Sequence, residues 1–486
     1  GGVAIYCALL IYYSEKLDAN VVPTGLFLVS VALLLMTSLR GWNITGHDIQ
    51  REYRVFELTK IGGLWSMSNL RDAYNACMSI TILPTIFSKS LKFFDPYVYK
   101  VFFQLLFAIV PSIIYLMLLR YVRPILALIS VLYFIAFPTF FGDMPFLNRQ
   151  EIAFVFLMLM FYVLFEESIK IKIRQWLFIA LGIGMILSHY TTTYTVVALL
   201  IFLVAARASL YLLGRFVAWH ELKHRFFTES SFEFLNTNVK QSVSRITIWM
   251  VVFLLGATFF WSSILTDTAK NSLYRVVIET ISVIKNNTKE DAQSNDITYN
   301  LFSFHRLDSK KLFSNYIQKV VEPIRFKAPA GTYYATSTYD RFSITVADTQ
   351  LLPLTVVGKK ISKLGIDVVN FNYIVRQSSA KLLQLLLIVG FIFALVRTSF
   401  FRRPLDTEFS LMMIGSFFFV ASQVLLPVLS VEYGLLRAFQ QSLMFFGVFV
   451  VIGSLVFFAR AKESIKIFFA GALVICFMLS STGVFI

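Results

Sequence analysis

Charge, cysteine and internal repetition are all scarce in this sequence of 486 residues. Charged residues make up 15% of the chain, whereas a soluble domain carries roughly 25%. The three cysteines, Cys7, Cys77 and Cys476, form no CxxC pair, so neither a disulfide framework nor a zinc site is indicated. No internal repeat is evident, which argues against a transporter built from inverted repeats.

Long apolar runs dominate the chain instead. Hydrophobic residues form 57% of it, and the mean hydropathy is +0.71, which predicts an all-α polytopic membrane protein with about 11 to 12 transmembrane helices. The first run begins at Gly1-Gly2, and we interpret it as a truncated span and not as a signal peptide. The candidate spans cover residues 1–13, 23–39, 97–119, 124–141, 150–166, 176–188, 190–213, 246–266, 382–397, 407–429, 435–459 and 466–486.

Basic residues fall on alternate loops between these spans. The other loops are nearly bare of them, and the alternation keeps one phase along the chain, so the positive-inside rule places the basic loops in the cytoplasm. The net charge of +16 then reflects these loops and attraction to anionic lipid, with no nucleic acid as a partner. The basic set comprises Arg120, Arg123, Lys170, Lys172, Arg174, Arg215, Lys223, Arg225, Lys240, Arg245, Arg397, Arg402, Arg403, Arg460, Lys462 and Lys466.

Two long segments then lie outside the cytoplasm. The first, residues 40–100, is an external loop within an N-terminal transmembrane module, residues 1–266. Its pattern predicts an amphipathic helix after Asp48, with Ile49, Tyr53 and Phe56 on one stripe. A second helical piece is expected from about Leu70 to Ser90, interrupted by Pro84. Such helices lie in the plane of the membrane interface.

The second long segment, residues 267–381, predicts a small extracytoplasmic α+β domain, followed by C-terminal transmembrane helices over residues 382–486. The stretch from Tyr333 to Asp348 alternates as strands do, and that from Leu351 to Lys363 is compatible with a helix. A segment of this length is too long for a simple loop.

Asp48 and Glu52 lie four residues apart, on one face of the predicted interfacial helix. Asp48 is either an N-cap, accepting backbone N–H groups, or part of a catalytic acid–base centre at the lipid boundary. Arg51 occupies the position where a capping box would place Glu or Gln. Glu52 needs a cationic partner, which Arg51, Arg54 or a substrate cation would supply.

Arg149 and Glu151 open a span on the same outer side. Arg149 is either an interfacial anchor or a bidentate contact to phosphate at a helix N-terminus, with Glu151 to orient it. His189 and Tyr190 join two spans on that side. Interfacial aromatic residues and structural histidines are common, but His189 is also suited to donate to a phosphate or a sugar hydroxyl.

One polar face interrupts an otherwise apolar span near the C-terminus. Tyr433, Arg437, Gln440 and Gln441 follow helical spacing, and Gln423 on the preceding span is placed to join them. This face is either a hydrogen-bonded seam between helices or a surface that meets phosphate.

The first external loop resembles that of the GT-C superfamily of integral membrane glycosyltransferases. Asp48 with Glu52 and Tyr53 is similar to the acidic motif of that superfamily, although Ile49 stands where a second carboxylate is usual. The stretches 79–84, 144–151 and 188–190 also resemble a poorly characterised group of archaeal and bacterial membrane proteins within it. The resemblance implies a polyprenyl-phosphate-linked sugar donor, extracytoplasmic transfer with inversion, and Asp48 as general base.

These observations predict a multi-pass glycosyltransferase that acts on an extracytoplasmic lipid, glycan or protein acceptor. Asp48 and Glu52 are the catalytic candidates, no metal ligands are assigned, and a divalent cation is left open as cofactor. A transporter or flippase for lipid-linked glycans and a non-catalytic membrane scaffold are the alternatives. The substrate-binding candidates are Arg51, Tyr53, Arg149, Glu151, His189, Tyr190, Tyr433, Arg437, Gln440 and Gln441.

Overall fold

The fold is described from a computed structural model of the chain. It describes residues 1–18, 20–219, 245–268, 314, 317–327, 353–396, 400–402, 405–425, 433–458 and 460–485. Within these residues the regular secondary structure is helical, joined by turns, and there is no strand. The predicted strands from Tyr333 to Asp348 lie outside the described residues, so the predicted α+β domain is not shown.

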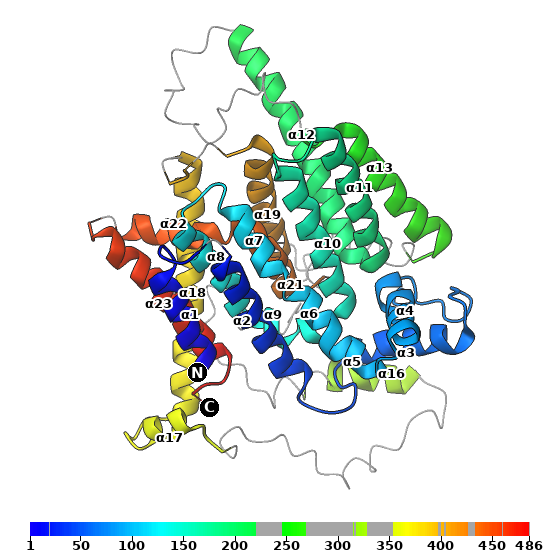
Figure 1. The fold of residues 1–486 in the computed structure, drawn as a ribbon, viewed down its shortest axis with the longest axis horizontal. Coiled ribbons are helices and arrows are strands. Elements are labelled where there is room, and N and C mark those ends of the chain that lie inside the picture. Colours follow the sequence, from blue (N-terminus) through cyan, green and yellow to red (C-terminus); the bar gives the residue numbers. More distant parts are fainter. Residues whose placement is uncertain are drawn as a thin grey trace.

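The all-α polytopic membrane fold is confirmed, and the helices gather in one bundle (Figure 1). Nine described helices are long and apolar enough to cross a membrane. Two bent pairs raise that number to 11 if each pair is one span, and the apolar helix α1 (Gly2–Tyr13) is shorter. The nine are α2 (Val21–Ser38), the stretch Asp95–Leu118 that ends in α6 (Phe103–Phe107) and α7 (Val110–Leu118), α10 (Asn148–Phe165), α11 (Ile171–Ser188), α12 (Tyr190–Trp219), α13 (Ile248–Phe259) with η5 (Phe260–Leu265), α18 (Val368–Val396), α19 (Thr407–Leu425) and α23 (Glu463–Ser481).

The two bent pairs each divide a span that the hydropathy pattern predicts as continuous. Between α8 (Pro124–Ala136) and α9 (Pro138–Gly142) the backbone of Phe137 is extended, because the residue before a proline is disfavoured in helical conformation, and the pair bends by 54°. Between α21 (Leu435–Phe446) and α22 (Val448–Phe457) the chain bends by 72° at Gly447. A Cβ at Gly447 would lie 2.9 Å from the carbonyl oxygen of Leu443, so a larger residue would not fit this bend.

Helix α18 is longer than the sequence predicts. It begins at Val368, well ahead of the span expected at 382–397. The expected span began too late because the first turns of the helix carry polar residues such as Asn372 and Gln377, which lower the local hydropathy. It packs closely on α22 through two glycines. A Cβ at Gly390 or at Gly453 would come within 1.8 Å of a backbone oxygen of the facing helix.

The first external loop forms the interfacial corner of the molecule, which Figure 1 shows as α3 (Asp48–Gly62) and α4 (Ile82–Leu91) beside α5 (Asp95–Tyr97). The amphipathic helix is confirmed as α3 (Asp48–Gly62), which ends at Gly63 with φ of 71°, a left-handed conformation that suits glycine. Ile49, Phe56, Ile80, Tyr99, Phe103 and Ile152 belong to a small core that seats α3 on the start of α10 and on the 95–107 stretch.

The second helical piece is shorter than predicted. After the single turn η1 (Met78–Ile80), helix α4 runs from Ile82 to Leu91. Pro84 does not interrupt it, because proline is tolerated in a first helical turn, where its missing N–H has no intrahelical acceptor. Residues 66–77 form turns instead of the expected helix.

Ion pairs join the helix ends at the opposite side of the bundle. Arg245 bonds to Asp406 at 2.8 Å and to Glu167 at 3.0 Å, and Arg120 pairs with Glu166 just beyond the C-terminal end of α10. Several residues of the predicted cytoplasmic loops are therefore in contact with one another, at the end of α10 remote from Asn148.

Candidate functional site

The site is built where α3 meets the N-terminus of α10. Asp48 is the first residue of α3, and the N-cap position belongs to His47. The carboxylate of Asp48 accepts a hydrogen bond from the guanidinium of Arg149, with 3.1 Å between Oδ2 and Nη2. The side chain thus joins two helices, and Asp48 retains 23% side-chain exposure whereas Arg149 retains 4%.

Glu52 supplies the cap that α10 does not find in its own sequence. Its Oε2 accepts the backbone N–H of Asn148 at 3.0 Å, and its Oε1 accepts that of Arg149 at 3.4 Å. Leu147, the N-cap residue of α10, has no oxygen in its side chain for this purpose. A carboxylate there also favours the positive end of the helix dipole.

Glu52 is fully buried, and this changes its acid–base behaviour. Burial raises the pKa of its carboxyl to about 7, while the charge of Arg149 and the hydrogen bonds to α10 oppose the rise. Its Oε1 lies 3.5 Å from Nε of Arg149, so Glu52 and Asp48 hold the same guanidinium. Neither Arg51 nor Arg54 is its partner, because Arg51 pairs with Asp72 and Arg54 lies near Glu57.

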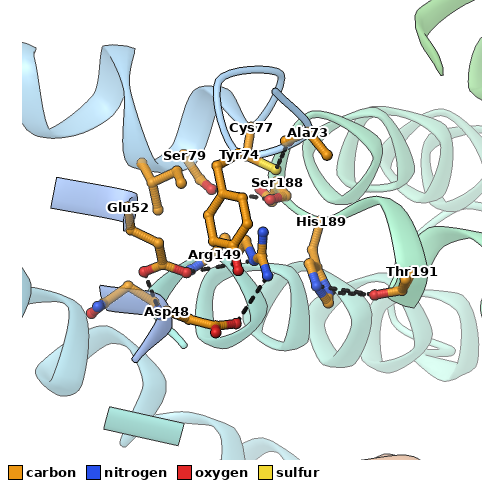
Figure 2. Close-up of polar contacts among 12 residues, drawn as sticks. Asp48, Glu52, Ala73, Tyr74, Cys77, Ser79, Arg149, Ser188, His189 and Thr191 are labelled. Atoms are coloured by element: carbon orange, nitrogen blue, oxygen red, sulfur yellow. Dashed lines mark hydrogen bonds and ion pairs between the residues drawn. The ribbon is translucent and has the colours of Figure 1, made fainter. Parts of the chain in front are cut away.

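Two aromatic rings face the guanidinium of Arg149. Its Cζ lies 3.6 Å from the ring centroid of Tyr74 (Figure 2). The ring centroid of Tyr190 lies 5.6 Å from the same atom. Nη2 donates to Asp48 and Nε lies 3.5 Å from the carboxylate of Glu52, but Nε and Nη1 are both buried and have no hydrogen-bond partner among the described residues. A buried donor in this state is costly unless a ligand completes it.

Glu151 turns away from Arg149, contrary to the expected orienting role. Its Oε2 accepts from Gln104 Nε2 at 3.0 Å, and the same amide group lies 3.3 Å from Asn148 Oδ1. Asp48 and Glu52 orient Arg149 instead.

His189 lies on the other side of Arg149, between α11 and α12 (Figure 2). Its Nδ1 lies 2.7 Å from the hydroxyl oxygen of Thr192, and its Nε2 lies 3.0 Å from that of Thr191. Burial and the charges of Arg149 and Arg437 lower the pKa of His189 well below its usual value. The imidazole is therefore neutral at physiological pH and retains one N–H donor.

The polar face of α21 divides between the site and a helix seam. Tyr433 donates to Gln441 and lies 3.4 Å from Gln150 of α10, next to Arg149 in the chain. Gln440 instead donates to the carbonyl of Phe134 on α8 at 3.1 Å. Arg437 forms no ion pair within the described part of the chain.

Arg51 and Tyr53 do not reach Arg149. Arg51 is largely exposed and pairs with Asp72 at 2.5 Å, and Tyr53 packs its ring against Phe56 and Tyr99. The sequence analysis missed Tyr74, which has no motif around it and lies in a turn region. It also missed Gln104, which reads as one polar residue in an apolar span.

The carboxylates at this site do not form a recognisable metal centre. No group of three or more His, Cys, Asp or Glu side chains in the described ranges could hold a metal ion. The hydrogen-bond donors near Arg149 are instead suited to an anion. They comprise the guanidinium groups of Arg149 and Arg437, the imidazole of His189 and the hydroxyl groups of Thr191 and Thr192.

The middle of this chain is similar to a known protein family. No curated protein matches it significantly. Residues 87–220 match the family described as dolichyl-phosphate-mannose-protein mannosyltransferase. The matched stretch contains Arg149, Glu151, His189 and Tyr190, but it excludes Asp48 and Arg437. This match supports the resemblance of the chain to the GT-C superfamily and to multi-pass membrane glycosyltransferases that use polyprenyl-phosphate sugar donors.

Proposed function

We propose that the protein transfers a sugar from a polyprenyl phosphate to a hydroxyl group of an extracytoplasmic lipid, glycan or protein, with inversion at the anomeric carbon. The observation that carries this proposal is the pairing of Asp48 with Arg149, whose Nε and Nη1 find no hydrogen-bond partner in the described part of the chain. A partly exposed carboxylate next to an incompletely paired guanidinium supplies a base and an anion contact together.

In the proposed reaction the acceptor oxygen attacks the anomeric carbon of the donor sugar. Asp48 takes the hydroxyl proton as the new carbon–oxygen bond forms. The bond between the anomeric carbon and the phosphate oxygen breaks, and polyprenyl phosphate leaves with the electron pair. Arg149 stabilises the negative charge that develops on the leaving phosphate.

Arg437 and His189 complete the proposed phosphate contacts. The charges of both Arg149 and Arg437 lower the pKa of the buried His189 imidazole, which supports a site where both cations act. Like charges repel in such surroundings, and an anion between them relieves the repulsion. Glu52 acts in this scheme by holding Arg149 in place, because its fully buried carboxylate is already bound to α10.

The side of the membrane follows from the basic loops. The ion pairs of Arg120 and Arg245 lie beyond the C-terminal end of α10, whereas Arg149 lies at its N-terminal end. By the positive-inside rule the site then faces away from the cytoplasm. A transporter would have to open a route through those ion pairs in every cycle, which favours the transferase.

The purified protein in lipid vesicles tests the proposal, with dolichyl-phosphate mannose as the first donor because the matched family is named for it. We expect transfer by the wild type, and a loss of at least about 100-fold in Asp48→Asn with donor binding retained. Glu57→Gln on the exposed side of α3 is the matched control. Full activity of Asp48→Asn would exclude Asp48 as the base, and absence of transfer with every polyprenyl-phosphate sugar would favour a scaffold.

A further inference from the structure

Tyr74 connects the turn region of residues 64–77 to the proposed reaction site. Its ring stacks on Arg149 at 3.6 Å, and Arg51 lies 5.0 Å from the same ring. Figure 2 shows Tyr74 lying over Arg149, with Asp48 and Glu52 near the same guanidinium. No sequence motif marks this tyrosine.

Hydrogen bonds within the turn region fix the backbone next to Tyr74. The Asn75 side-chain amide donates to the carbonyl oxygens of Ser66 and Leu70, both at 2.9 Å, and Trp65 Nε1 donates to the carbonyl of Asn75 at 2.9 Å. Trp65 also stacks on Trp261 of η5, with 5.9 Å between ring centroids.

Asp72 fixes the backbone next to the ring. Its Oδ1 accepts the backbone N–H of Tyr74 at 2.9 Å, while its Oδ2 pairs with Arg51 of α3. The backbone is therefore fixed on both sides of Tyr74, which sets the direction in which its side chain leaves the chain.

The stacked ring leaves the edge of the guanidinium for hydrogen bonding. Tyr74 occupies one face, and Nη2 donates to Asp48. Nε lies 3.5 Å from Glu52, and among the described residues neither Nε nor Nη1 has a hydrogen-bond partner. A stacked cation keeps its plane, and its in-plane donors stay available to a planar or tetrahedral anion.

The phenol stays neutral beside the candidate base. Burial raises the pKa of Tyr74 to about 12, the charge of Arg149 opposes the rise, and the charge of Asp48 adds to it. The hydroxyl is therefore protonated at neutral pH.

We propose that Tyr74 is a positioning residue of the transferase: its ring presents the Nη1 edge of Arg149 to the donor phosphate. This inference rests on the proposed function. Because the ring carries this task, removing the ring and removing only the hydroxyl should have different effects.

Tyr74→Leu removes the ring and Tyr74→Phe removes only the hydroxyl. We expect Tyr74→Leu to raise KM for the donor on the order of tenfold, and Tyr74→Phe to restore KM to within about twofold of the wild type. Tyr97→Leu, in the same external region and 39% exposed, is the matched control.

Binding of a polyprenyl phosphate without sugar separates this inference from the proposed function. If the wild type binds it and Tyr74→Leu binds about tenfold more weakly, Tyr74 positions Arg149 whether or not transfer occurs. If the wild type transfers sugar but Tyr74→Leu keeps its KM and affinity, the inference fails alone. Equal losses of kcat in Tyr74→Leu and Tyr74→Phe, without a change in KM, would reduce Tyr74 to a structural residue.

Discussion

Replacing Glu52 with glutamine should remove a pH-dependent loss of stability. The carboxyl of Glu52 is fully buried, and its pKa is raised to about 7 in the folded protein, compared with an ordinary value of 4.5. Below pH 4.5 the group is protonated in both the folded and the unfolded chain. Between pH 4.5 and 7 the unfolded chain ionises first, so stability falls as the pH rises through this window, and above it no further change occurs.

The size of this effect follows from the two pKa values. Each pKa unit corresponds to about 1.4 kcal/mol, so the wild type should lose about 3 kcal/mol of folding free energy between pH 4.5 and 8 through this one group. Glu52→Gln has no proton to release, and its amide oxygen still accepts the N–H of Asn148. The variant should therefore lack this part of the pH dependence.

Thermal unfolding in detergent micelles at a series of pH values measures the difference. The gap in midpoint between Glu52→Gln and the wild type should widen by a few degrees from pH 4.5 to 8, and Glu57→Gln, exposed on the same helix, should track the wild type. Glu52→Leu should be less stable at every pH, since it leaves two N–H groups of α10 without an acceptor, at about 1–3 kcal/mol each. Identical pH slopes for Glu52→Gln and the wild type would refute the burial argument.

Three further substitutions test other parts of the site. Arg149→Lys keeps the charge but loses the planar fork, so it should raise donor KM by about tenfold or more in steady-state kinetics. Arg437→Gln should weaken donor binding with little change in unfolding midpoint, and it should raise the pKa of His189, which can be followed by NMR of the imidazole. Arg245→Met should lower the free energy of unfolding by about 1–3 kcal/mol, because it removes the ion pairs with Asp406 and Glu167. Donor KM should stay unchanged, since these ion pairs lie at the other end of the bundle. A changed KM would mean that the two ends are coupled.

The sequence predicted the helical elements of the first external loop unevenly. Helix α3 was predicted because the spacing of Ile49, Tyr53 and Phe56 is a property of the local chain. The stretch of residues 66–77 could not be predicted in the same way. Its turns depend on hydrogen bonds from Asn75 and Trp65, and its place depends on the stack with Trp261, far along the chain.

The candidate site residues were predictable from the sequence, but their contacts were not. Asp48, Arg149, His189 and Arg437 stand out in the sequence because charged or polar groups are costly beside apolar spans. The residues that contact them do not stand out in the sequence. A side chain on a helix face can reach several neighbouring groups, and only the packing of the helices decides which of them it contacts. Thus Glu151 was expected to orient Arg149, whereas Asp48 and Glu52 do so.

The sequence by itself determined the membrane fold, because the transfer of an apolar run into lipid depends on the length and composition of that run alone. It also determined the alternation of basic loops. Only the tertiary structure decided that Asp48 meets Arg149, 101 positions away. The small core around Ile49, Phe56 and Ile152 sets α3 against α10, and this packing brings together charges that no local pattern relates.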